Sequence, residues 1–196
     1  MVLLILAAVS GTGKSTIARE LLRRQNQLKL SVSHTTRQMR AGESDGVHYH
    51  FVNRTDFDSM VIENGFAEWA EYVGNAYGTA KTTIEMAKAN STDLVFDIEI
   101  QGARQIKAQY PDALMVFLLP PDWSEVRRRL ESRGTDDPAT VEARLKRGQI
   151  EMASASEFDY LVVNKELDQA VSDVEAIYRA AKLRTHQQSS RLDSLL

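Results

Sequence analysis

Residues 2–9 form an unbroken apolar run, and a glycine-rich segment and then a helical pattern over 14–25 follow it directly. A short apolar run bounded by glycines is typical of a strand buried on both faces, as in a parallel sheet. The run is far shorter than the ~20 residues that cross a bilayer, and only Met1 precedes it, whereas a secretory signal begins with a basic segment. We therefore expect a cytoplasmic protein without membrane contact, whose first strand leads straight into a helix.

Further apolar runs alternate with helical patterns along most of the chain. Strands connected through helices form βαβ units, whose strands lie parallel and whose helices cover both faces of the sheet. The alternation therefore predicts an α/β fold with a parallel sheet flanked by helices. The expected strands are 2–8, 28–33, 93–99, 113–119 and 160–163, and the expected helices are 14–25, 101–110, 124–133, 138–156 and 167–187.

The segment 34–90 interrupts this alternation. It begins with a polar stretch and continues with short strand-like pieces at 49–52 and 66–73, on either side of a helical pattern at 55–64. We interpret it as an insertion into the sheet domain or a subdomain of its own.

Composition excludes several classes of protein. The chain has 196 residues and no cysteine, which excludes a thiol nucleophile, a zinc–cysteine site and a disulfide framework. Its 24 Lys and Arg against 27 Asp and Glu give a net charge of −3, which argues against a broad basic surface for nucleic acid. Any phosphate group must therefore bind to a local cluster of basic residues.

The glycine-rich segment 10–16, Ser-Gly-Thr-Gly-Lys-Ser-Thr, stands between the first strand and its helix. Glycines let the backbone turn tightly enough to point several N–H groups at a phosphate, and the helix N-terminus adds partial positive charge. In such a loop Lys14 reaches the β- and γ-phosphates of a nucleotide, and the Ser15 hydroxyl ligates Mg²⁺. The full pattern G-x-x-x-x-G-K-[ST] has glycine where this chain has Ala8. An ordinary glycine-rich turn is the alternative.

A second basic cluster lies in residues 33–43, where Arg37 and Arg40 are three residues apart, with Ser33 before them and Tyr49 after. Guanidinium groups bind phosphate oxygens in pairs, and the Ser and Tyr hydroxyls can complete the contacts. The pattern suits a phosphate monoester, although a solvated arginine-rich loop could contain the same residues.

Taken together, the two clusters make the chain resemble guanylate kinase, the nucleoside-monophosphate kinase that phosphorylates GMP. The resemblance extends over the whole chain, 1–196, and implies a single domain with a P-loop kinase fold. Its parts would be a core at 1–33, 91–123 and 157–196, a GMP-binding insertion at 34–90 and a helical lid at 124–156. The motifs that carry the resemblance are 10–16, 33–43 with Asp45, Gly46 and Tyr49, 68–70, 74–79, 97–102, 129–135, Arg144 and 163–164.

The resemblance also implies roles for individual residues. The catalytic residues would be Lys14, Arg40, Arg133 and Arg144. ATP would be bound by Ala8, Val9, Ser10, Gly11, Thr12, Gly13, Lys14, Ser15, Thr16, Arg133 and Asn164. GMP would be bound by Ser33, Arg37, Arg40, Glu43, Tyr49, Glu68, Tyr77, Gly78, Thr79, Asp97 and Glu99. Mg²⁺ would be held by Ser15 and Asp97, in part through water.

The residues expected to read the base can also be argued from chemistry. Guanine offers O6 as an acceptor, and N1–H and a 2-amino group as donors. The Glu68 carboxylate can accept from both N–H groups while the Thr79 hydroxyl donates to O6, and adenine would leave these partners unpaired. The alternatives are a solvated strand residue at Glu68 and a plain turn at Tyr77 and Thr79.

A phosphate acceptor needs no general base, because its second pKa of ~6 leaves it largely ionised at neutral pH. Catalysis then consists of positioning and charge neutralisation around a loose in-line transition state. The resemblance places Arg133 and Arg144 in a lid over the phosphates, with Arg129 either assisting them or lying solvated on its helix. The histidines are expected at the surface or in loops, without a role: His34, His48, His50 and His186.

Two positions depart from the family pattern. Ala8 is expected to keep strand geometry, where its methyl group does no harm, because it ends the first apolar run. Glu99 stands where the family has aspartate, and its extra methylene leaves open how it contacts the acceptor. Asp97 keeps the place of a carboxylate that holds a metal-bound water, and an ion pair with Lys14 is its structural alternative.

The sequence thus predicts transfer of phosphate from ATP, with Mg²⁺, to GMP and to dGMP, giving GDP from GMP. Two other functions stay open: a kinase for another phosphorylated acceptor, such as a ribose phosphate, and a non-catalytic binding module on the same fold. Intact Lys14 and Arg144 argue against the binding module, and Glu68 and Thr79 argue against the other acceptor. No pattern decides between a monomer and a homo-oligomer.

Overall fold

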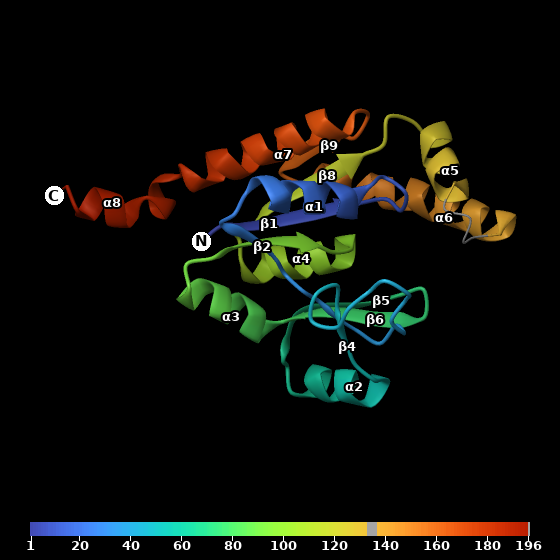
Figure 1. Cartoon of the computed structure of the whole chain (residues 1–196), viewed down its shortest axis with the longest axis horizontal. Coiled ribbons are helices and arrows are strands. Elements are labelled where there is room, and N and C mark those ends of the chain that lie inside the picture. Colours follow the sequence, from blue (N-terminus) through green and yellow to red (C-terminus); the bar gives the residue numbers. More distant parts are fainter. Residues whose placement is uncertain (133–136, 196) are drawn as a thin grey trace.

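The structure, a computed structural model, describes residues 1–132 and 137–195. Its centre is a five-stranded sheet in the order β2-β7-β1-β8-β9, in which every neighbouring pair is parallel. The expected α/β fold with a parallel sheet flanked by helices is therefore confirmed (Figure 1). The strands are β1 (Leu3–Ala8), β2 (Leu28–Leu30), β7 (Asp93–Asp97), β8 (Leu114–Leu119) and β9 (Tyr160–Val163).

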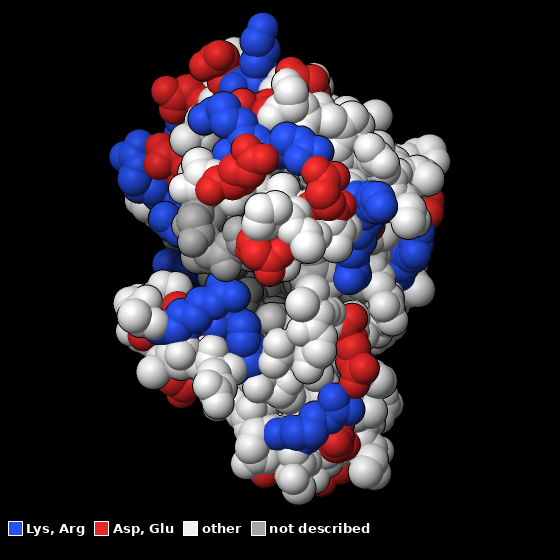
Figure 2. All heavy atoms as spheres, turned by 90° about the vertical axis from the view of Figure 1, so that its right-hand side faces the viewer, with Lys and Arg blue, Asp and Glu red and all other residues white. Residues whose placement is uncertain are grey.

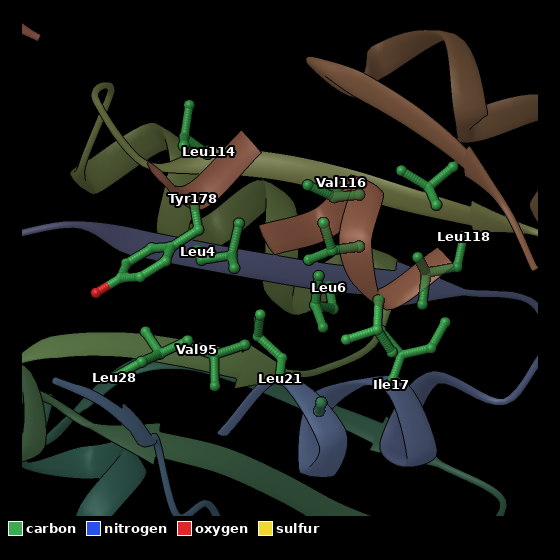
Figure 3. Packing of buried hydrophobic residues seen from close by; sticks show 14 of the residues in the cluster. Leu4, Leu6, Ile17, Leu21, Leu28, Val95, Leu114, Val116, Leu118 and Tyr178 are labelled. Atoms are coloured by element: carbon green, nitrogen blue, oxygen red, sulfur yellow. The ribbon is translucent and has the colours of Figure 1, made fainter. Parts of the chain in front are cut away.

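Helices cover both faces of this sheet, and four of them are α1 (Lys14–Arg24), α3 (Lys81–Ala89), α4 (Ile100–Gln109) and α7 (Leu167–Lys182). On one face, α1 and α7 pack on Leu4 and Leu6 of β1, which are fully buried (Figure 3). On the other face, Leu3 and Ile5 of β1 pack against α3 and α4. Because β1 is buried on both faces, its sequence is continuously apolar and does not alternate.

The arrangement of β1 and β7 determines where a ligand can bind. The two strands are neighbours, with Leu6 opposite Asp97, but α1 and α4 leave them on opposite faces of the sheet. Where connections diverge in this way, the carboxyl ends of parallel strands open a crevice in which ligands bind. The glycine-rich loop after β1 and residues 97–99 at the end of β7 meet at this crevice.

A second sheet lies beside the core (Figure 1), built from β3 (His34–Thr35), β4 (His50–Phe51), β5 (Phe66–Tyr72) and β6 (Asn75–Ala80) in the order β4-β3-β6-β5. Helix α2 (Arg54–Ile62) packs on it through Phe57, whose ring centroid lies 4.5 Å from that of Phe66. All four strands and α2 come from the segment 34–90, which the sequence marks as an insertion.

Two further helices, α5 (Trp123–Glu131) and α6 (Pro138–Met152), pack on each other through a small cluster of their own. Each begins at an aspartate whose carboxylate accepts a backbone N–H in the first turn: Asp122 from Glu125 and Asp137 from Thr140. The cluster contains Val126, Leu130, Val141 and Leu145.

Several boundaries differ from those expected. The strand expected at 28–33 ends at Leu30, and His34–Thr35 joins the second sheet instead. The helices expected at 138–156 and 167–187 end at Met152 and Lys182, and the short 3-10 helices Ala153–Glu157 and Thr185–Gln187 follow them, with α8 (Ser189–Asp193) beyond. Strand β6 and helix α3 were not expected at all. Among the described residues, no helix has the length and apolar character needed to cross a membrane.

Candidate active site

The glycine-rich loop turns sharply between β1 and α1. Gly13 caps α1 with a φ of 94°, and a Cβ atom there would lie 2.7 Å from Nδ2 of Asn164. Gly11 has a φ of 88°, so both glycines adopt a backbone conformation that disfavours other residues. Ala8 is the last residue of β1 and has no such φ, so it keeps strand geometry as expected.

Two side chains from other elements hydrogen-bond to the backbone of this loop. Asn164 Nδ2 and Arg129 Nη1 both donate to the Thr12 carbonyl oxygen, at 2.6 and 2.9 Å. Arg129 Nη2 also donates to the Asn164 carbonyl, at 3.2 Å. The interpretation of Arg129 as a solvated helix residue is therefore wrong, because it ties α5 to the loop. A cavity of about 360 Å³ opens on this side, lined by Gly11, Gly13, Thr16, Arg129, Ser132, Asn164, Lys165 and Leu167.

Lys14 lies in the crevice at the end of β7. Its Nζ donates to the Ile98 carbonyl at 2.6 Å and lies 3.1 Å from Asp97 Oδ1 and 3.4 Å from Glu99 Oε1. Burial by itself lowers the pKa of Lys14, but the carboxylates of Glu99 and Asp97 outweigh it and raise the pKa above its ordinary value. The ion pair between Lys14 and Asp97 is thus present in this structure.

The arginine cluster is closed by an internal carboxylate. Arg37 binds Glu43 through two hydrogen bonds of 2.7 and 3.0 Å, and the backbone N–H of Arg40 donates to the same carboxylate at 2.8 Å. The hydrogen bond from Arg37 lowers the pKa of Glu43, which stays ionised. The rings of Tyr49 and Tyr77 meet edge to face beside it, with centroids 5.9 Å apart. The Glu43 carboxylate therefore accepts the same guanidinium N–H groups of Arg37 that a phosphate would accept.

The two residues that the sequence analysis assigns to base recognition, Glu68 and Thr79, are buried. Glu68 on β5 is 4% exposed, and Thr79 on β6 is fully covered and donates from Oγ1 to Glu68 Oε1 at 2.7 Å. Ser33 Oγ lies 3.4 Å from the Thr79 hydroxyl. Burial raises the pKa of Glu68 to about 7, although hydrogen bonds from Thr79 oppose the shift. A solvated Glu68 is therefore excluded, and so is a plain turn at Tyr77 and Thr79, which lie in β6.

Two cavities meet at the crevice. One of about 220 Å³ is lined by the loop 8–16 and by Tyr49, Tyr72, Asp97, Glu99 and Arg144. The other, of about 460 Å³, lies between α1 and the arginine cluster, and Arg37, Arg40 and Glu43 line it. Ser15, Tyr49 and Asp97 line both. Figure 2, which faces this edge, shows a hollow between the two parts of the molecule with basic side chains on one side.

Helix α6 approaches the second sheet across this crevice. The Arg147 guanidinium lies 4.1 Å from the centroid of the Tyr72 ring, and Arg144 lines the smaller cavity together with Lys14. Arg133 lies outside the described residues. Tyr72 and Arg147 were not predicted from the sequence, since an aromatic at the end of a strand and an arginine on a helix are both common.

Two of the histidines are not the surface or loop residues that were expected. His34 on β3 and His50 on β4 are half-buried, and their ring centroids lie 4.6 Å apart. Burial and the neighbouring His50 lower the pKa of His34, although Asp45 acts against the shift. His48 and His186 are exposed as expected.

Comparison with known proteins gives one answer. A sequence model of the guanylate kinase family matches residues 1–181. The chain belongs to the guanylate kinase family. It is 44% identical to the guanylate kinase of Dechloromonas aromatica, over 96% of this chain and 94% of that protein, and 43% identical to that of a Thermus thermophilus strain, over 99% and 88%. The crystal structure of the guanylate kinase from Anaplasma phagocytophilum superposes with a TM-score of 0.78 at 30% identity, covering 94% of this chain and 87% of that one.

The guanylate kinase fold of this chain brings most of the described candidate residues into three places, and Asn164 lies in a fourth. The loop 8–16, Asp97, Glu99 and Arg144 line the smaller cavity, and the arginine cluster lines the larger one. Glu68, Thr79 and Ser33 form a buried chain of hydroxyl and carboxyl groups on the second sheet and the segment before it. Asn164 lies behind the loop.

Proposed function

We propose that this chain transfers the γ-phosphate of ATP to GMP, and to dGMP as well. The observation that carries the proposal is the junction of the two cavities. The cavity at the loop suits a triphosphate, the cavity at the arginine cluster suits a monophosphate, and Ser15, Tyr49 and Asp97 line both. A donor phosphate and an acceptor phosphate bound in these cavities would lie next to each other at that junction. Direct transfer between two phosphates needs this arrangement.

In the smaller cavity, the donor cavity, the triphosphate of ATP would pair with the positive charge of Lys14. That side chain is paired with Asp97 and Glu99 in this structure, so binding exchanges carboxylate partners for phosphate oxygens. Arg144, and Arg133 from outside the described residues, would add positive charge as α5 and α6 close. Asn164 and Arg129 would keep the loop in shape through the Thr12 carbonyl, beside the cavity that we assign to the adenosine.

In the acceptor cavity, Arg37, Arg40 and Tyr49 would bind the phosphate of GMP. Glu43 would lose part of its hydrogen bonding to Arg37, because the phosphate competes for the same N–H groups. The attacking oxygen is ionised at neutral pH and needs no general base. Glu68 and Thr79 would bind the guanine edge, with the carboxylate facing N1–H and the 2-amino group.

A divalent metal fits the donor cavity. The oxygen ligands available to a metal there are the Ser15 hydroxyl and the Asp97 carboxylate. Mg²⁺ is commonly held by one or two such oxygens together with substrate phosphates. The described residues contain no cluster of three or more metal-binding side chains, so a metal would be held jointly with the nucleotide. When bound, Mg²⁺ neutralises charge on the transferring phosphates.

The cytoplasmic location stays a prediction.

A coupled assay of ADP release tests the function directly. GMP, dGMP, AMP, UMP, CMP and a ribose phosphate are each supplied with ATP and Mg²⁺, and we expect turnover with GMP and dGMP at least tenfold above the others. Turnover confined to the ribose phosphate would show a kinase for another acceptor. Absence of turnover with every acceptor, together with retained GMP binding, would show a binding module.

A further inference from the structure

One face of α4 lies along the outer edge of β5. β5 is the last strand of its sheet, so the backbone groups on that edge have no strand to pair with. Gln105 takes the place of a strand there, because its Nε2 donates to the Trp69 carbonyl at 2.8 Å and its Oε1 accepts from the Trp69 N–H at 3.1 Å. Gln109, one turn later, donates to the Ala67 carbonyl. These bonds fix the backbone on both sides of Glu68.

Gly102 lies on the same face of α4, three residues before Gln105. A Cβ atom at this position would lie 3.0 Å from Cδ of Glu68 and would overlap its Oε2. Gly102 has no positive φ, so the backbone does not require glycine there. In a helix interior glycine is less favourable than alanine. The space taken by the Glu68 carboxylate therefore accounts for glycine at this position.

Helix α4 also begins at the phosphate site. Glu99 is its N-terminal cap residue, and the preceding Ile98 carbonyl accepts from Lys14. One rigid helix thus connects the residues around Lys14 with the carboxylate of Glu68.

We propose that Gly102 and Gln105, with Gln109, are positioning residues that set the Glu68 carboxylate for base recognition. Gly102 leaves room for the Glu68 carboxylate, and the two glutamine amides fix the strand backbone on both sides of Glu68. The proposal rests on the function proposed above, in which Glu68 reads guanine. It predicts that substitutions on this face of α4 change the choice of base and not only the stability of the fold.

The test uses GMP and IMP as acceptors, because IMP keeps N1–H and O6 of guanine but lacks the 2-amino group. In Gly102→Ala the displaced carboxylate should lose the 2-amino contact, so the GMP/IMP ratio of kcat/KM should fall at least fivefold while KM for ATP stays within twofold. The matched control is Arg104→Ala, on a different face of α4, where the side chain binds Glu157. That variant should leave the ratio unchanged.

A second pair of variants separates positioning from a general loss of structure. Gln105→Glu keeps an acceptor for the Trp69 N–H but sets a carboxylate oxygen against the Trp69 carbonyl, and it should lower the GMP/IMP ratio at least twofold. It decides the question if Gly102→Ala does not fold. In a Glu68→Ala background, Gly102→Ala should cause no further fall, because the carboxylate that it displaces is gone.

The possible failures are distinguishable. An unchanged GMP/IMP ratio in both Gly102→Ala and Gln105→Glu, or an equal fall with and without Glu68, would overturn the positioning by α4 alone. An unchanged ratio in Glu68→Ala would overturn the reading of guanine by Glu68 and this proposal with it. Absence of GMP phosphorylation by the wild-type chain would overturn the proposed function itself.

Discussion

Lys14 and Glu68 are both ionisable side chains largely shielded from solvent, yet the surroundings of Lys14 favour the charged form and those of Glu68 disfavour it. Lys14 lies among the Asp97 and Glu99 carboxylates, which outweigh the effect of burial and raise its pKa. The hydrogen-bond partner of Glu68 is the Thr79 hydroxyl, and burial raises the pKa of the carboxyl to about 7. One group is kept charged, and the other is half neutral at neutral pH.

The difference corresponds to the ligands that we assign to the two places. A triphosphate carries negative charge at every physiological pH, so a permanent cation suits it, and two carboxylates keep that cation satisfied until the ligand arrives. Guanine is neutral and offers N–H donors. A carboxyl that ionises when those donors arrive avoids the cost of an unpaired buried charge in the free protein.

Removing the cation should have the largest effect. Lys14→Ala deletes a contact to the transferring phosphate, on the scale of ~3 kcal/mol, and kcat should fall about a hundredfold or more. Steady-state kinetics with saturating GMP measures it, and Lys29→Ala, at an exposed position on β2, is the matched control. A Lys14→Ala enzyme with more than a tenth of the wild-type kcat would remove Lys14 from the mechanism.

The carboxyl is tested next, through its geometry. Glu68→Gln replaces a two-acceptor carboxylate with a group that has one acceptor and one donor, so a donor faces a guanine donor. Charge-assisted hydrogen bonds are worth ~1.5–3 kcal/mol, so kcat/KM for GMP should fall tenfold to a hundredfold, while AMP loses little or gains slightly. If GMP and AMP lost activity in equal proportion, Glu68 would support the fold and would not read the base.

A smaller effect is expected for Arg144, which lines the donor cavity from α6. Arg144→Ala should lower kcat about tenfold, or ~1.4 kcal/mol, since in our proposal Arg133 would supply further charge. The affinity for GMP, measured by calorimetry without ATP, should stay within twofold. A loss of GMP affinity as large as the loss of kcat would place Arg144 on the acceptor side.

The same comparison shows what the sequence could predict. The core strands and the phosphate loop were predictable because continuous apolar runs and a glycine motif are local signals, and the adjacency of Lys14 and Asp97 follows from parallel strand order. Strand β6, Asn-Ala-Tyr-Gly-Thr-Ala, has few residues of high strand propensity and was missed for that reason. The burial of Glu68 and the need for glycine at 102 arise only when α4 packs on β5, so no local pattern reveals them.

Proton release on GMP binding tests most directly the central claim that Glu68 must ionise to read guanine. With a pKa of about 7, the free carboxyl is largely protonated at pH 6, and binding through N1–H and the 2-amino group requires the ionised form. The affinity of the wild type relative to that of Glu68→Gln should therefore fall about tenfold per pH unit below 7 and level off above it. Calorimetry at pH 6 in two buffers of different ionisation enthalpy counts the protons, and Glu68→Gln subtracts those that come from the phosphate. We predict that the wild type releases nearly one proton more than Glu68→Gln at pH 6 and the same number at pH 8.5; equal release at pH 6 would contradict the account.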